Sequence, residues 1–251
     1  MRYFIELSYN GSQYHGWQSQ PNAITVQQTV ENSLQLILKN KMIKIIGAGR
    51  TDTGVHALQM YAHFDFDQSF DTHNLIFKLN SFLHNNIVIN NIVRVHCEAH
   101  ARFDAVMREY KYFLTTKKDV YNNDTKYYFT KKLDFEEISK AIGIIKKNTN
   151  FKSFCRSKTD VTNFECIINN FEYEIINSEV IFTISANRFL RNMVRAIIGT
   201  ILDIGLYKIS VEKLKDIIDK SNRIYAGPSV PAHGLFLTRV EYPENIFIND
   251  K

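Results

Sequence analysis

The chain has few cysteines and no long apolar stretch. Its three cysteines, Cys97, Cys155 and Cys166, are odd in number, and none stands in a CxxC pair. This pattern favours free thiols in a reducing cytoplasm over disulfides or a zinc site. The apolar runs are short and broken by Asn, Lys and Arg, so none indicates a membrane span. The N-terminal residues lack the apolar core of a secretory signal, and we expect a cytoplasmic protein that does not associate with a membrane.

The common nucleotide-binding motifs are also missing. The sequence contains neither the GxxxxGK[ST] loop nor GxGxxG spacing, which argues against both phosphate-binding loops. The formal net charge of +5 is only mildly basic. Charge alone favours an ordinary surface with slightly more Lys than Glu over the alternative of a basic stripe for a polyphosphate partner.

Hydrophobic periodicity in the first hundred residues predicts the order βαββαβ. Thr25 stands at capping-box spacing before a helical stripe that runs to about residue 39. A second helical stripe lies at residues 75–83, after a strand with strict alternation. The expected strands of this half cover residues 3–9, 43–46, 59–66 and 87–95.

The rest of the chain repeats this order. Asp134 precedes a helical stripe, Asn177 lies in the turn of a predicted hairpin, and a short helix follows Ser210. The expected elements are strands at 110–114, 167–176, 180–184 and 234–242, and helices at 135–145 and 190–201. We therefore predict an α+β fold with two ferredoxin-like halves, residues 1–100 and 101–251. The halves are expected to share a mostly antiparallel sheet with a central cleft.

The most informative segment is the glycine-rich stretch 47–57, which reads GAGRTDTGVHA between two predicted strands. Its glycines permit positive φ angles and close approach of a partner to the backbone. It places a guanidinium, Arg50, two residues before a carboxylate, Asp52. On its own, the segment is better explained as a tight turn with a surface ion pair.

This segment resembles the catalytic motif GRTDxGVHA of the TruA-type tRNA pseudouridine synthases. Four further blocks resemble that family in order and extend the resemblance over nearly the whole chain. Residues 14–27 match its GWQxQ and TVQ blocks, 101–112 its ARxxAxxRxYxY, 187–195 its FLxxMVR and 234–237 its GLxL. Residues 83–87 depart from the family, reading LHNNI where it usually has LPxDI, which bears on local RNA contacts and not on the catalytic residue.

The resemblance implies the pseudouridine synthase fold and the isomerisation of uridine to pseudouridine in the anticodon arm of tRNA, at positions 38, 39 and/or 40. It implies no metal and no organic cofactor, and a homodimer in which one tRNA touches both subunits. Asp52 takes the place of the catalytic carboxylate. Such a group can attack covalently or remove a proton, so attack on C1′, attack on the base and removal of the C2′ proton all stay open.

Other residues take roles from the same motifs. Tyr110 matches the active-site tyrosine that stacks on a flipped base, although it is one of 13 tyrosines and would otherwise be explained by a strand face. Arg195 is expected to face Asp52, against the alternative of an arginine extending to solvent. Arg50 is expected to contact phosphate or to eject the paired base. Weaker candidates for phosphate contacts, each equally explained as a solvated charge, are Arg102, Arg108, Lys111, Arg188 and Arg191.

Two other functions compete with this interpretation. A non-catalytic RNA-binding module is the first, because RNA-recognition motifs share the βαββαβ order, but no strand shows their RNP1 pattern. The second is a hydrolase that uses Asp52 with His56 or His63. A metal site at His63, Asp65 and Asp67 is disfavoured, because these residues share one side of a strand without a wider ligand set.

Overall fold

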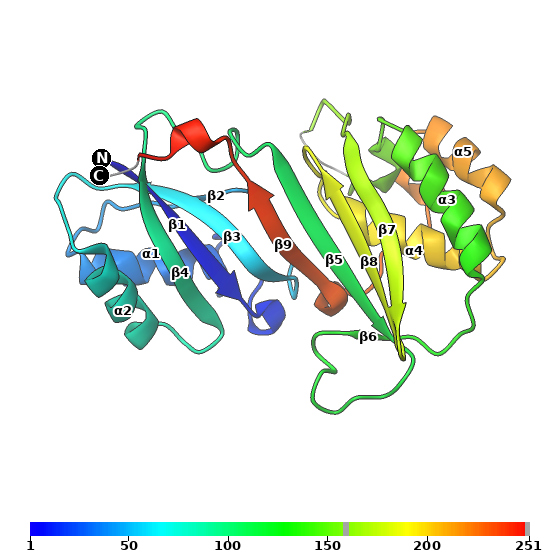
Figure 1. Cartoon of the computed structure of the whole chain (residues 1–251), viewed down its shortest axis with the longest axis horizontal. Helices are drawn as coiled ribbons and strands as arrows, with labels where there is room; N and C mark the ends of the chain where they lie inside the picture. The colour runs from blue at the N-terminus through cyan, green and yellow to red at the C-terminus, as the bar shows by residue number, and fades with distance from the viewer. Residues whose placement is uncertain (158–160, 249–251) are drawn as a thin grey trace. The chain divides into compact units, whose positions relative to one another are not determined.

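The computed structural model describes residues 1–157 and 161–248 (Figure 1). The chain forms two compact units, one of Met1–Met107 with Phe236–Lys251 and one of Arg108–Leu235. The division by periodicity at residue 100 assigned the whole C-terminal part to the second half. In the structure the last segment belongs to the first unit, because its strand pairs with an open strand edge there. Such a pairing between distant segments leaves no local signal in the sequence.

The first unit contains the predicted order βαββαβ, followed by the returning strand. Its elements are β1 (Arg2–Tyr9), α1 (Val26–Ile37), β2 (Ile46–Gly47), β3 (His56–Asp65), α2 (Thr72–Phe82), β4 (Ile87–Val95) and, from the chain's end, β9 (Leu235–Glu241).

Strand β3 is central to the placement of the glycine-rich loop. One edge of β3 and both edges of β1 are filled by antiparallel pairing in the order β4-β1-β3. On the other edge of β3, β2 pairs with only two residues and is shorter than the predicted strand at 43–46. The beginning of that edge is left for β9, which pairs in parallel with His56 and Ala57. The strand before the loop, β2, and the returning strand, β9, are therefore both paired with β3, the strand that follows the loop.

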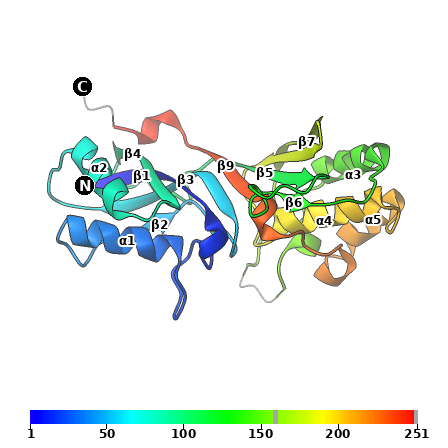
Figure 2. The same cartoon turned by 90° about the horizontal axis from the view of Figure 1, so that it is seen from below.

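Alternating side chains of β1 face two different layers. Ile5 and Leu7 are completely buried, as are Val30 and Leu34 of α1, which covers one face of the strands (Figure 2). Helix α1 begins as predicted, since the Thr25 hydroxyl accepts a hydrogen bond from the Gln28 N–H at 3.3 Å.

The opposite face of β1 is covered by the end of the chain. Phe4 is fully buried and packs edge-to-face on Tyr242, with ring centroids 5.0 Å apart, and on Phe247. Tyr242 also donates a hydrogen bond to the Ala101 carbonyl at 2.6 Å. These contacts hold the segment after β9 on the first unit.

The second unit holds a three-stranded antiparallel arrangement, β5-β8-β7, with a short parallel strand on β5 that periodicity did not predict. Its helix α4 covers one face of these strands (Figure 2). Its elements are β5 (Met107–Thr115), β6 (Tyr127–Tyr128), α3 (Phe135–Lys147), β7 (Ile168–Ile176), β8 (Glu179–Ala186), α4 (Met193–Gly205) and α5 (Val211–Asp219).

Local signals of the second unit behave as expected. Asp134 caps α3 by accepting hydrogen bonds from Glu136 and Glu137, and Asn177 forms the β7–β8 turn at φ 55°. The described residues form nine strands and five α-helices, and the strands pair mostly antiparallel, which confirms the α+β class. None of the helices within residues 1–157 and 161–248 has the length and apolar character needed to cross a membrane.

Candidate active site

The glycine-rich segment forms a tight turn between β2 and β3. The Val55 N–H donates to the Asp52 carbonyl at 3.1 Å, and Gly54 adopts a positive φ of 78°. Within this turn Thr51 is buried, Asp52 is half-buried and Arg50 is exposed. A half-buried carboxylate on a short, hydrogen-bonded turn is accessible to a ligand yet has little freedom to move.

A second loop, residues 10–17, packs directly against this turn. A Cβ added to Gly11 would lie 2.0 Å from the Val55 carbonyl oxygen, and one added to Gly16 would lie 2.5 Å from that of Thr51. Gly16 also has a φ of 85°, which side chains rarely tolerate. The backbone N–H of the next residue, Trp17, donates a hydrogen bond to the Thr51 carbonyl at 3.2 Å. The glycines thus permit two backbones to meet beside Asp52.

Buried aromatic side chains also support the same turn. The Tyr9 hydroxyl and the Thr51 hydroxyl share a buried hydrogen bond of 2.9 Å. Trp17 is 2% exposed and its indole fills the space that a side chain at Gly47 would need. Thr51 is therefore held through both its backbone and its side chain, which orients the neighbouring Asp52. Such support is what a preorganised catalytic group requires.

His56 has a structural function in the first unit. It is 1% exposed, accepts a hydrogen bond at Nδ1 from the Gly11 N–H at 3.1 Å, and stacks on Phe236 with ring centroids 4.4 Å apart. An imidazole that accepts at Nδ1 is neutral, with its proton on Nε2. His56 thereby links the loop at Gly11, the turn before β3 and the beginning of β9.

His63 is similarly occupied by the fold. Its Nδ1 accepts from the Ala101 N–H at 3.1 Å, and burial, together with the nearby Arg2 charge, lowers the pKa of His63 from 6.5 to about 4. Asp65 forms a two-point ion pair with Arg2. Among residues 1–157 and 161–248, no three His, Cys, Asp or Glu side chains gather as a metal site would require.

In the second unit, Tyr110 lies on β5 opposite Ile184 of β8 and is half-buried. Its ring meets Phe189 edge-to-face, at a centroid distance of 5.2 Å and an interplanar angle of 88°. Phe189 belongs to the loop that precedes α4. The Tyr110 ring is therefore braced on one side, an arrangement that suits an aromatic platform for stacking.

Arg195 lies in the first turn of α4 and is half-buried. Its Nε donates to the Val230 carbonyl at 2.8 Å, and the Val230 N–H donates to the Arg195 carbonyl at 3.2 Å. The approach of this segment to α4 depends on small residues, because a Cβ on Gly199 would lie 1.7 Å from the Pro228 oxygen. The side chain thus has a fixed direction, which the alternative of an arginine extending into solvent does not predict.

The weaker basic candidates fall into different surroundings. Arg108 donates to the Asn187 carbonyl at 2.9 Å and so ties β5 to the loop after β8. Arg102 is exposed and lies over the Phe103 ring. Lys111 and Arg188 are half-buried, and Arg191 is exposed. Asp52 and Arg50 belong to the first unit, Tyr110 and Arg195 to the second, and their meeting in one site stays a prediction.

Sequence reasoning did not identify Tyr9 and Gly11 as supporting residues, and it considered His56 as a partner of Asp52 in a hydrolase rather than as a support. Their signal is weak, since a tyrosine on a strand and a glycine after it are common. The three cysteines are free thiols, as expected, and two of them are buried. Burial raises the pKa of Cys166 to about 11, which keeps that thiol protonated.

Comparisons with known proteins agree with these features. A family model described as tRNA pseudouridine synthase matches residues 7–104 and 148–243. Proteins named tRNA pseudouridine synthase A are similar over almost their whole length. The one from Azobacteroides pseudotrichonymphae is 46% identical, covering 99% of each chain, and that from Bacteroides fragilis is 45% identical, covering 98% of each. That from Bacillus subtilis is 35% identical, over 96% of this chain and 99% of its own.

These matches favour an enzyme over the non-catalytic RNA-binding module, because they span both units and include the Asp52 turn. They also favour an isomerase over the hydrolase that was weighed against it. The chain belongs to the tRNA pseudouridine synthase family, with the pseudouridine synthase fold of the TruA type.

Proposed function

We propose that this enzyme isomerises uridine to pseudouridine in the anticodon arm of tRNA, at positions 38, 39 and/or 40, and that Asp52 is its catalytic carboxylate. The observation that carries the proposal is the placement of Asp52. It is half-buried on a turn that the 10–17 loop packs against. Two glycines of that loop, Gly11 and Gly16, allow the two backbones to approach closely. The surrounding motif supports the same assignment.

The reaction rearranges bonds within one nucleotide. The bond between ribose C1′ and uracil N1 breaks, the base turns, and C1′ joins C5. The hydrogen on C5 leaves as a proton and N1 gains one, so no oxidant, reductant or group donor enters the balance. Asp52 acts on C1′, on the base or on the C2′ proton, and each of these routes needs an ionised carboxylate beside the sugar.

The remaining site residues act on the substrate around Asp52. A base inside a stem must leave the stack to be reached, and the Tyr110 ring, braced by Phe189, supports stacking of the flipped uracil. Arg195, whose Nε is held by Val230, provides the cation that faces the carboxylate. Arg50 is exposed and contacts phosphate or takes the place of the ejected base.

Backbone phosphates of the tRNA contact further cations. The candidates are Arg102, Arg108, Lys111, Arg188 and Arg191, and the two motif blocks that contain all five support this role. We further propose that the enzyme acts in the cytoplasm as a homodimer, in which one tRNA contacts both subunits. The free thiols support a reducing compartment.

Substitution of Asp52 by asparagine tests the proposal. Asp52→Asn keeps the size of the side chain but removes its ability to act as nucleophile or base, so pseudouridine formation is expected to stop. tRNA binding should persist, because phosphate contacts supply most of the affinity. The assay follows tritium released to water from uridine labelled at C5 in the anticodon arm, with nucleoside analysis of the product.

Asp67→Asn is the matched control, because it makes the same chemical change at an exposed carboxylate of the same unit. It should retain normal turnover. Substantial turnover by Asp52→Asn, with host enzyme excluded, would remove Asp52 from the catalytic role. Release of free uracil by the wild-type enzyme would instead indicate a glycosidase.

A further inference from the structure

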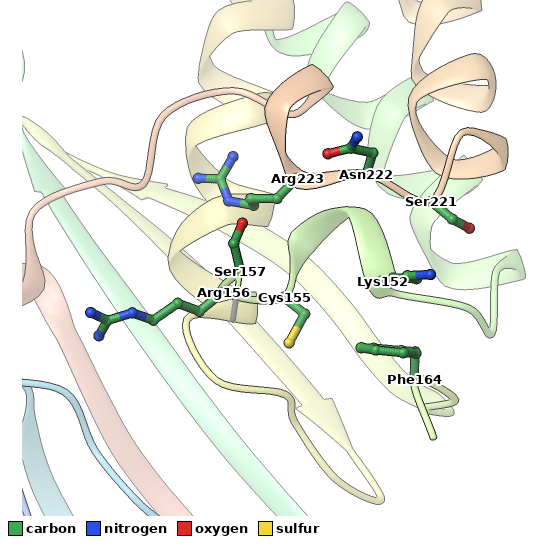
Figure 3. Close-up of a pocket in the computed structure, with 8 residues that line it drawn as sticks. All are labelled: Lys152, Cys155, Arg156, Ser157, Phe164, Ser221, Asn222 and Arg223. Carbon is green, nitrogen blue, oxygen red and sulfur yellow. The ribbon is translucent and has the colours of Figure 1, made fainter. Parts of the chain in front are cut away.

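The second unit contains a basic pocket that none of the assigned roles uses. It has a volume of about 350 Å³ and lies between the 3₁₀ turn Lys152–Phe154 and the segment that follows α5 (Figure 3). Three cations line it, Lys152, Arg156 and Arg223, together with polar side chains such as Asn222. None of the residues that line it is a carboxylate.

The two walls of this pocket are joined by one buried hydroxyl. Ser153 is 1% exposed, donates to the Ile217 carbonyl at 2.6 Å and accepts from the Asn222 N–H at 3.0 Å. The 3₁₀ turn and the segment after α5 are thereby fixed to each other although they are about seventy residues apart in sequence. The two walls of the pocket are consequently held at a fixed position relative to each other within the second unit.

The charges of the pocket are not neutralised by the described part of the chain. The Arg223 guanidinium donates to the carbonyls of Ala226 and Gly227 and to the Ser229 hydroxyl, none of which carries a charge. Lys152 lies 5.4 Å from the Phe164 ring centroid. Within residues 1–157 and 161–248, none of the three cations forms an ion pair with a carboxylate.

The directions of the cations indicate the shape of their ligand. The side chains of Lys152 and Arg156 extend away from each other (Figure 3). They do not converge on one point, as they would around a single small anion. Separate cations along an open pocket suit a polyanion with spaced charges, such as an RNA backbone.

The pocket continues towards the residues proposed to hold the target base. The Arg156 N–H donates to the Arg191 carbonyl at 3.0 Å. Two residues before Arg191, Phe189 packs on Tyr110. Tyr110, the loop 188–191 and the pocket therefore form one continuous run of contacts inside the second unit.

We propose that this pocket binds successive backbone phosphates of the tRNA strand that continues from the nucleotide at Tyr110, with Lys152 and Arg156 as the contacting cations. The inference rests on the proposed function, since that function supplies the RNA. Arg223 holds the segment 226–229 in place through its hydrogen bonds. Its positive charge also lies on the wall of the pocket that follows α5.

The test is the double variant Lys152→Ala/Arg156→Ala, because both side chains are exposed. Each phosphate contact on a single strand contributes about 0.7 to the slope of log affinity against log salt, so the slope should fall by about 1.4. The KM for tRNA should rise while kcat at saturating tRNA stays unchanged. Lys131→Ala/Lys132→Ala removes the same charge from an exposed loop of the same unit and should keep the wild-type slope.

Three results would overturn the pocket assignment. One is a wild-type salt slope and KM in the double variant. Another is a loss of kcat at saturating tRNA with unchanged affinity. The third comes from calorimetry with inorganic phosphate alone: saturable binding to wild type that the double variant lacks would make the pocket a site for free anions. If instead wild type forms no pseudouridine while tRNA affinity still depends on the two cations, the proposed function fails and the pocket stands.

Discussion

Replacing Gly16 with alanine is expected to destabilise the first unit and to displace Asp52. Two costs combine at this position. The backbone has a φ of 85°, and the added Cβ would lie 2.5 Å from the Thr51 oxygen and 3.1 Å from the Asp52 carbonyl carbon. A left-handed backbone and an overpacked contact together cost about 2–5 kcal/mol of unfolding free energy. The atoms that must move belong to the backbone beside Asp52, so relief of the overlap shifts the carboxylate.

The chain's single tryptophan provides the assay. Trp17 is the residue next to Gly16, is 2% exposed, and hydrogen-bonds to the same Thr51 oxygen. Denaturant unfolding followed by its fluorescence therefore reports on this part of the first unit. Gly49→Ala is the matched control, because a Cβ there meets no atom within 4 Å and its φ is not positive.

Activity gives a second measurement of the same substitution. A displacement of a catalytic group by about 1 Å is enough to lower turnover about a hundredfold, so kcat of Gly16→Ala should fall at temperatures where the protein is still folded. The reasoning is refuted if Gly16→Ala unfolds at the same denaturant concentration as Gly49→Ala. A stable variant with normal kcat would show that the 10–17 loop does not position Asp52.

Three further predictions concern single side chains. Tyr110→Ala should weaken productive binding of the flipped base by about 1–3 kcal/mol in kcat/KM, whereas Tyr110→Phe should keep the stacking, and equal losses in both would assign the role to the hydroxyl. Arg195→Met should lose turnover while its tRNA affinity is kept, and Arg195→Lys should recover only part of the rate because a point charge lacks the guanidinium fork; normal turnover of the Met variant would exclude the role. Because burial lowers the pKa of His63 to about 4, only the unfolded state binds its proton between pH 6.5 and about 4, so stability falls as the pH drops through that window. His63→Asn, which can still accept from Ala101, should flatten this part of the stability curve, and the exposed His73→Gln should not; equal curves for both variants would contradict the assignment.

The features that the sequence by itself determined are those with local causes. Thr25 and Asp134 begin their helices because each side chain accepts hydrogen bonds from N–H groups a few residues ahead. Asn177 makes the β7–β8 turn because it tolerates a positive φ. The Asp52 segment was identified through its resemblance to a family motif, which could be recognised because the residues of the motif are contiguous in the chain.

Only the tertiary structure decided the features that join distant segments. The pairing of β9 with the first unit depends on an edge of β3 that the two-residue β2 leaves open, and no local pattern records that edge. The partnership of Gly11 with His56 spans forty-five residues, and that of Ser153 with Asn222 spans sixty-nine. A glycine or a histidine in the sequence does not state which backbone approaches it. For that reason the sequence could indicate Asp52 as a candidate, whereas the packing of the 10–17 loop against its turn and the basic pocket are evident only in the folded chain.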